Sequence, residues 1–196
     1  MRSLFSGGSD GNEQLTAIVG VLLVLGLAVE GATLLNLRGL MTVHAFVGML
    51  LIPTVALKLA STGWRLARYY LRGEEYVLRG PPHLVLRAVV APVTVVSTVV
   101  LFGTGILLLA RGQDHGTLVG LHKASFIVWL PATGLHVLTR LQRLLPALRR
   151  RLSGTASRVA LTGAAVLAGM ALAVLTLPAA DHLQDQLSAF VGIDAG

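Results

Sequence analysis

Two histidines inside long apolar stretches carry the clearest chemical signal in this sequence. His44 and His122 each lie about one helical turn inside one end of such a stretch. Ionisable side chains inside a membrane are costly to bury and usually have a function. One further stretch separates these two, so both run in the same direction and hold their rings at similar depth. Two neutral imidazoles facing each other across a helical bundle suit a six-coordinate haem iron, and we expect His44 and His122 to be its ligands.

A second pair of nitrogen bases lies farther along the same two stretches. His136 follows His122 by 14 residues, and Lys58 follows His44 by the same interval. In a helix this interval gives a net rotation of about −40° and a rise of about 21 Å. Each base is therefore expected on nearly the same face as its histidine, close to the opposite membrane surface. The amine of Lys58 is expected to extend toward the lipid head groups.

Neighbouring residues fit a haem pocket at the level of His44. Gly48 lies one turn below His44 on the same face, where a porphyrin can approach the backbone. Glu30, in the preceding stretch, lies at a similar depth. It is expected to accept a hydrogen bond from the ring nitrogen opposite the iron, with proton transfer or a place among the head groups as alternatives. The candidate partners of the haem propionates are Lys123, Arg38 and Arg111.

The composition predicts the elements that position these residues. Apolar residues make up 54% of the 196 residues and charged residues only 13%, against about 25% charged in a soluble domain. Five apolar stretches are long enough to cross a bilayer as helices. They cover residues 15–37, 40–62, 88–110, 117–138 and 159–177. The sequence therefore predicts an all-α integral membrane protein with five transmembrane helices and a four-helix-type bundle core.

The domain boundaries follow from these stretches. Residues 1–14 form a predicted cytoplasmic leader, residues 15–178 a single transmembrane domain, and residues 179–196 a short extracytoplasmic tail. The last apolar stretch carries small residues four apart, Ala164 with Ala168 and Ala165 with Gly169. Small residues at this spacing allow helices to approach closely.

Charge placement predicts the orientation in the membrane. The net charge is +7, but the basic residues gather in segments 63–87 and 139–158 between apolar stretches, so a nucleic-acid partner is not expected. The positive-inside rule places these segments and the N-terminus in the cytoplasm and the C-terminus outside. The composition, in which arginine far outnumbers lysine, is typical of a GC-rich bacterial genome and favours a bacterial plasma membrane.

The spacing of the histidines resembles that of bacterial cytochrome b561-like proteins and other di-haem membrane cytochromes b. The matching elements are the segment from His44 to Gly48 and the segment from His122 to His136, within about residues 40–140. The resemblance implies bis-histidine b haem and quinone-linked electron transfer. In this comparison His44 and His122 match an outer haem pair, and His136 matches one ligand of an inner haem.

The inner position departs from that family. Lys58 stands where a second histidine would lie, and His83, just before the third stretch, is the candidate replacement because it lies on the same side as His136. The expected cofactor is therefore one b haem, or two if the inner site is complete. The expected function is a membrane-bound cytochrome exchanging electrons with quinone or a partner redox protein. The alternative is a haem-free accessory or scaffold subunit whose histidines only form hydrogen bonds between helices.

Overall fold

The computed structural model describes residues 8–71, 86–112, 116–149 and 152–194, which are helical apart from short turns. No strand occurs in these ranges. The elements are α1 (Gly8–Thr33), η1 (Leu34–Asn36), α2 (Met41–Tyr70), η2 (Leu86–Val90), α4 (Ala91–Arg111), α5 (Gly116–Arg149) and α6 (Thr155–Asp194).

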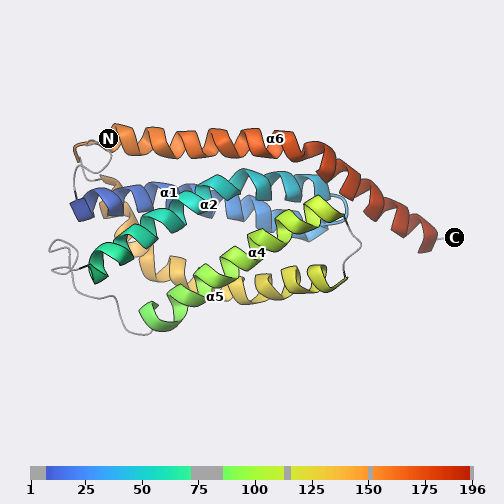
Figure 1. Cartoon of the computed structure of the whole chain (residues 1–196), viewed down its shortest axis with the longest axis horizontal. Helices are drawn as coiled ribbons and strands as arrows, with labels where there is room; N and C mark the ends of the chain where they lie inside the picture. The colour runs from blue at the N-terminus through green and yellow to red at the C-terminus, as the bar shows by residue number, and fades with distance from the viewer. Residues whose placement is uncertain (1–7, 72–85, 113–115, 150–151, 195–196) are drawn as a thin grey trace.

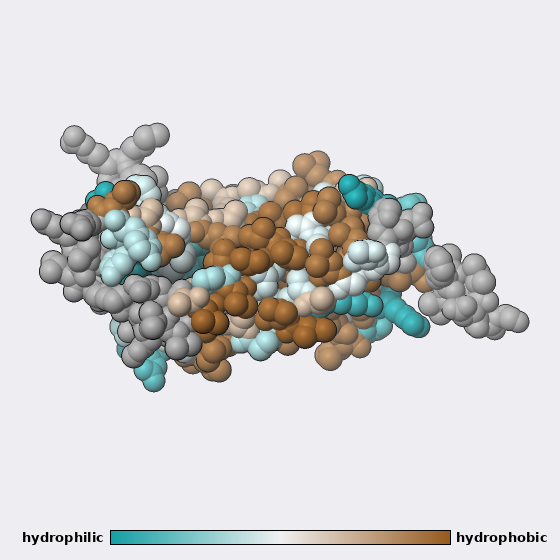
Figure 2. All heavy atoms as spheres, turned by 60° about the horizontal axis from the view of Figure 1, so that its bottom comes forward, coloured by the Kyte–Doolittle hydropathy of each residue, from teal (hydrophilic) through white to brown (hydrophobic). Residues whose placement is uncertain are grey.

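Five helices are long and apolar enough to cross a membrane. They cover Gly8–Asn36, Met41–Tyr70, Ala88–Arg111, Gly116–Gln142 and Thr155–Ser188, with mean hydropathies between 1.3 and 2.3. Apolar side chains dominate the middle of the face in Figure 2, and hydrophilic ones gather toward its ends. The prediction of an all-α, multi-pass membrane protein with five spans is therefore confirmed.

Four of the helices form the predicted bundle core. Helix α1 packs against α2 and α5, and α4 packs against α5 and α2. Consecutive helices run in opposite directions, and α6 lies along the outside of the bundle, packed mainly against α2 (Figure 1). Because α1 and α4 each contact both α2 and α5, the helices α2 and α5 occupy diagonal positions in the core.

A small apolar cluster holds α1 and α2 together. It consists of the buried residues Val19, Leu23, Val47, Leu51 and Val55. The members on each helix are four residues apart, so they form one stripe on each helix and the two stripes face each other. Since lipid is as apolar as these side chains, their contribution comes from close packing rather than from transfer out of water.

Helix α6 contacts α2 through small residues. A Cβ atom at Gly169 would overlap the Leu50 carbonyl group of α2. Ala173 is fully buried, and Ala180 is 1% exposed. The predicted close helix contact is therefore confirmed at Gly169. Helix α6 packs along α2 over much of its length.

The ends of the spans differ from the sequence prediction. Helix α1 already begins at Gly8, within the predicted leader 1–14, and α6 continues to Asp194 through the predicted tail 179–196. Figure 1 shows α6 bending in its C-terminal part, which contains Pro178. The Gln184 side chain accepts hydrogen bonds from the backbone N–H groups of Met41 (2.8 Å) and Thr42 (3.4 Å). This contact caps the start of α2 and joins α6 to it at this end of the bundle.

Candidate functional site

His44 is held by two side chains at the C-terminal end of α1. Its Nδ1 lies 2.9 Å from Thr33 Oγ1 and 3.1 Å from Glu30 Oε1. The Thr33 hydroxyl donates its hydrogen to the Glu30 backbone carbonyl at 2.6 Å, so it can only accept from the ring. The proton of neutral His44 is therefore assigned to Nδ1, which leaves the Nε2 lone pair available.

His122 is held in the same way by α4. Its Nδ1 lies 2.9 Å from Thr104 Oγ1 and 3.1 Å from the Leu101 carbonyl oxygen. Thr104 donates its own hydrogen to the Val100 carbonyl at 2.7 Å, and a carbonyl oxygen can only accept. Both partners therefore require a proton on Nδ1, and Nε2 again carries the lone pair.

The two rings belong to the same end of the core. His44 lies near the start of α2 and His122 near the start of α5, on diagonal helices that run in the same direction. Within the described ranges, neither Nε2 atom forms a hydrogen bond. The structure therefore places the two histidines that the sequence singled out at the same end of the core, on diagonal helices.

The Glu30 carboxylate occupies the space beside Gly48. A Cβ atom at Gly48 would lie 3.4 Å from Glu30 Oε1, so the glycine lets this side chain cross toward His44. The second oxygen, Oε2, is buried and has no hydrogen-bond partner in the structure as described. The group that approaches Gly48 here is therefore the carboxyl group of Glu30.

The opposite end of the core holds Lys58 and His136. Lys58 Nζ donates to the Thr16 carbonyl oxygen at 2.6 Å, and it lies 3.0 Å from where a Cβ at Gly20 would stand. The amine thus turns inward to α1, and the expectation that it extends to the head groups is wrong. The reason is that the Thr16 carbonyl offers an acceptor beside the glycine.

The remaining predicted residues contribute less to the site. Lys123, Arg38 and Arg111 are exposed at the His44 end of the bundle, and no contact joins them to either histidine ring. His83 lies outside the described residues. The sequence did not single out Thr33 or Thr104, because neither hydroxyl has a fixed sequence separation from the histidine it contacts. Their expected depth in the spans was the only available signal.

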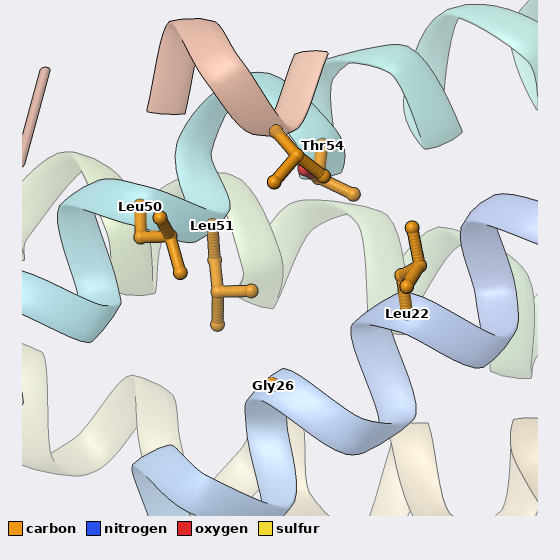
Figure 3. Close-up of a pocket in the computed structure, with 6 residues that line it drawn as sticks. Leu22, Gly26, Leu50, Leu51 and Thr54 are labelled. Atoms are coloured by element: carbon orange, nitrogen blue, oxygen red, sulfur yellow. The ribbon is translucent and has the colours of Figure 1, made fainter. Parts of the chain in front are cut away.

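Two apolar hollows lie away from the histidines. The one in Figure 3, of about 130 Å³, lies between α1, α2 and α6. Its lining residues are Leu22, Gly26, Leu50, Leu51, Thr54 and Val166. The other, of about 380 Å³, lies between α1, α5 and α6. Neither is lined by a histidine or a carboxylate, so neither belongs to the histidine site.

Comparison with family models, curated proteins and solved structures finds no match for this chain. The site is therefore interpreted from its own geometry. No group of three or more His, Cys, Asp or Glu side chains able to hold a metal occurs in the described part of the chain. The arrangement offers two imidazole nitrogens at one level.

Proposed function

We propose that the protein is a membrane-bound b-type cytochrome that carries electrons through a haem ligated by His44 and His122. The observation that supports this most is that both imidazole rings have the same hydrogen-bonding arrangement. Each donates its Nδ1 proton to neighbouring acceptors and keeps its Nε2 lone pair without a partner. A six-coordinate haem takes two such axial nitrogens, while the porphyrin supplies the other four ligands.

The neighbours of the rings fit the same role. Metal-ligating histidines nearly always donate their second N–H to a carboxylate, a backbone carbonyl or water, which fixes the ring and raises its basicity. His44 has a carboxylate partner in Glu30, and His122 has a carbonyl partner at Leu101. Thr33 and Thr104 add a hydroxyl acceptor to each ring. These contacts orient both imidazoles before any ligand binds.

The chain contributes ligation, orientation and exclusion of water, and a bound haem supplies reversible one-electron chemistry at iron. The proposed partner is a quinone from the bilayer or a redox protein at the His44 end. Arg65 and Arg68 lie at the opposite end of α2, so the positive-inside rule puts the His44 end outside a bacterial plasma membrane. Exposed Lys123 is the proposed partner of a haem propionate at that surface.

One haem is proposed rather than two. At the other level the described residues offer Lys58 as the base on α2 that corresponds to His136 on α5, and that amine is already hydrogen-bonded to Thr16. A second haem ligated by His136 and His83 remains a prediction from the sequence.

The test is haem binding by purified protein expressed with ample haem. We expect a Soret band and a sharp α band on reduction, and loss of most of this absorbance in His44→Ala and in His122→Ala. His182→Ala is the matched control, because His182 is an exposed histidine on α6. A colourless wild-type protein, or haem retained in full by both variants, would contradict the proposal and favour a haem-free accessory subunit.

A further inference from the structure

The larger of the two apolar hollows forms a groove between three membrane-spanning helices. It has a volume of about 380 Å³ and lies where α5 ends and α6 begins, beside the N-terminal half of α1. Leu22, Val159 and Gly163 border the groove and are also exposed on the surface of the helices. The groove is therefore open along the side of the bundle. Its walls include Val21 and Leu22 of α1, Leu148 of α5, and Val159, Thr162 and Gly163 of α6.

Contacts on either side of the groove hold α6 in place. Near the start of α6, Arg158 Nη1 donates to Gln14 Oε1 of α1 at 2.7 Å, and both side chains are only 1% exposed. Farther along α6, a Cβ atom at Gly169 would overlap the Leu50 carbonyl group of α2. Because α6 is fixed at both points, the groove between them belongs to the packed bundle and does not close by a simple shift of α6.

The walls of the groove present hydrocarbon. Thr162 is the polar residue among those that line it, and its hydroxyl donates to the Arg158 backbone carbonyl of its own helix at 2.8 Å. Apolar cavities of this kind stay free of water, and one of about 150 Å³ is large enough to bind benzene. The groove has more than twice that volume, so it can hold part of an acyl chain from the surrounding bilayer.

A basic side chain lies beside the groove. Arg149 directly follows the wall residue Leu148 in the last turn of α5 and is exposed. The positive-inside rule assigns this end of the bundle to the cytoplasmic side, where anionic lipids attract basic residues. The guanidinium group of arginine pairs well with phosphate oxygens. Because lipid is as apolar as the walls, the acyl chain alone gives little preference, and selectivity must come from the head group.

We propose that this groove binds an anionic phospholipid. One acyl chain lies between α1, α5 and α6, and the phosphate of the head group pairs with Arg149. Basic pockets between transmembrane helices on the cytoplasmic side bind such head groups in other membrane proteins. Neither proposed haem ligand lines the groove, so the proposal does not rest on the cytochrome function.

The experiment counts the lipids that stay bound to the purified full-length protein, by native mass spectrometry from maltoside micelles. Phosphatidylglycerol and phosphatidylcholine with the same acyl chains are added in equal amounts. We expect one phosphatidylglycerol to stay bound about fivefold more often than phosphatidylcholine, as one basic side chain near an anionic head group provides. No retained lipid, or equal retention of the two, overturns the proposal. Retention of an added isoprenoid quinone in place of phosphatidylglycerol also overturns it.

Variants that fill the groove test where the acyl chain lies. A Cβ atom at Gly163 meets nothing within 4 Å, so Gly163→Leu adds a side chain to open space, and we expect the bound phosphatidylglycerol to be lost. Gly134→Leu is the matched control, because Gly134 is exposed on α5, has equally open surroundings and lines neither hollow. Val21→Phe fills the same groove from α1 if Gly163→Leu fails to fold. Phosphatidylglycerol retained at the wild-type level in both filled variants overturns the proposal.

A charge variant tests the position of the head group. Arg149→Gln should lower the retention of phosphatidylglycerol to that of phosphatidylcholine. Arg68→Gln, which removes an exposed charge at the same end of the bundle, should keep the preference. A preference that is unchanged in Arg149→Gln overturns the proposal.

The result is separable from the haem proposal. Mass spectrometry detects bound lipid whether or not the protein is coloured, so a haem-free protein can be tested in the same way. Gly163→Leu should keep the haem spectrum of the wild type, because Gly163 lies away from both histidines. Loss of the lipid with an intact haem spectrum supports the groove, and failure to bind lipid leaves the cytochrome proposal standing.

Discussion

Glu30 Oε1 lies 3.1 Å from His44 Nδ1, so a carboxylate of α1 contacts the imidazole at the start of α2. The corresponding partner of His122 is the neutral carbonyl of Leu101 at 3.1 Å. A carboxylate that accepts a ring proton makes the imidazole more basic than a carbonyl does. The two proposed ligands therefore differ in how strongly they donate electrons to iron.

Glu30→Gln should raise the reduction potential of the haem. At a pH where Glu30 is ionised, the amide of the variant can still accept from Nδ1 but carries no charge, so His44 donates less and the ferric state loses stability. We expect a rise of tens of millivolts, where about 60 mV is a tenfold change for a one-electron couple. Potentiometric titration of the α band measures it. Asp185→Asn, an exposed change on α6, is the control, and an unchanged or lower potential in Glu30→Gln would contradict this role.

Thr104→Val should weaken haem binding without unfolding the protein. The change removes the hydroxyl 2.9 Å from His122 Nδ1 and leaves only the Leu101 carbonyl to orient the ring. Loss of such an outer partner lowers metal-site affinity by about 10- to 100-fold. Haem titration of the apoprotein measures the effect. Thr176→Val is the matched control, because Thr176 bonds only to carbonyls of its own helix. Equal affinities in the two variants would argue against the contact.

Gly169→Ala should destabilise the bundle. The added Cβ meets the backbone carbonyl of Leu50, which cannot rotate away, so α6 must shift from α2. Overpacking of this kind costs about 1–3 kcal/mol. Gly163→Ala is the matched control on the same helix, because a Cβ there meets nothing within 4 Å. Thermal unfolding in detergent compares the two, and a Gly169→Ala protein as stable as the control would refute the close contact.

Reporter fusions should show the C-terminus outside the cytoplasm. Arg65 and Arg68 lie at one end of the bundle, and α6 ends at the other, so the positive-inside rule gives this orientation. Alkaline phosphatase fused after residue 194 should be active, and the same enzyme fused after residue 71 should be inactive. The reverse pattern would place the His44 end in the cytoplasm and change the proposed redox partner.

The sequence predicted the fold well because each span is an apolar run of membrane length. Hydropathy alone locates such runs, and all five are present as helices. The sequence did not predict where the helices end, because the helices continue past the apolar runs where polar contacts between helices satisfy the chain. Gln184 provides such a contact to Met41 across 143 residues, and no local pattern indicates it.

The site was predicted in part. The sequence predicts that His44 and His122 lie at the same depth in the membrane, because depth follows from counting residues along antiparallel spans. The rotation of each helix about its axis is set by packing, so contacts such as Thr33 with His44 could not be derived. The same limitation explains Lys58, whose inward orientation depends on Gly20 and the Thr16 carbonyl on another helix.

Electron paramagnetic resonance of the oxidised protein can decide whether His44 and His122 bind haem iron, because it reports the axial ligands of that iron. We expect a low-spin ferric signal from two nitrogen ligands in the wild type. In His44→Ala and in His122→Ala, the signal should become high-spin or disappear with the haem. A low-spin signal that persists unchanged in both variants, or a wild-type protein without haem, would contradict the account.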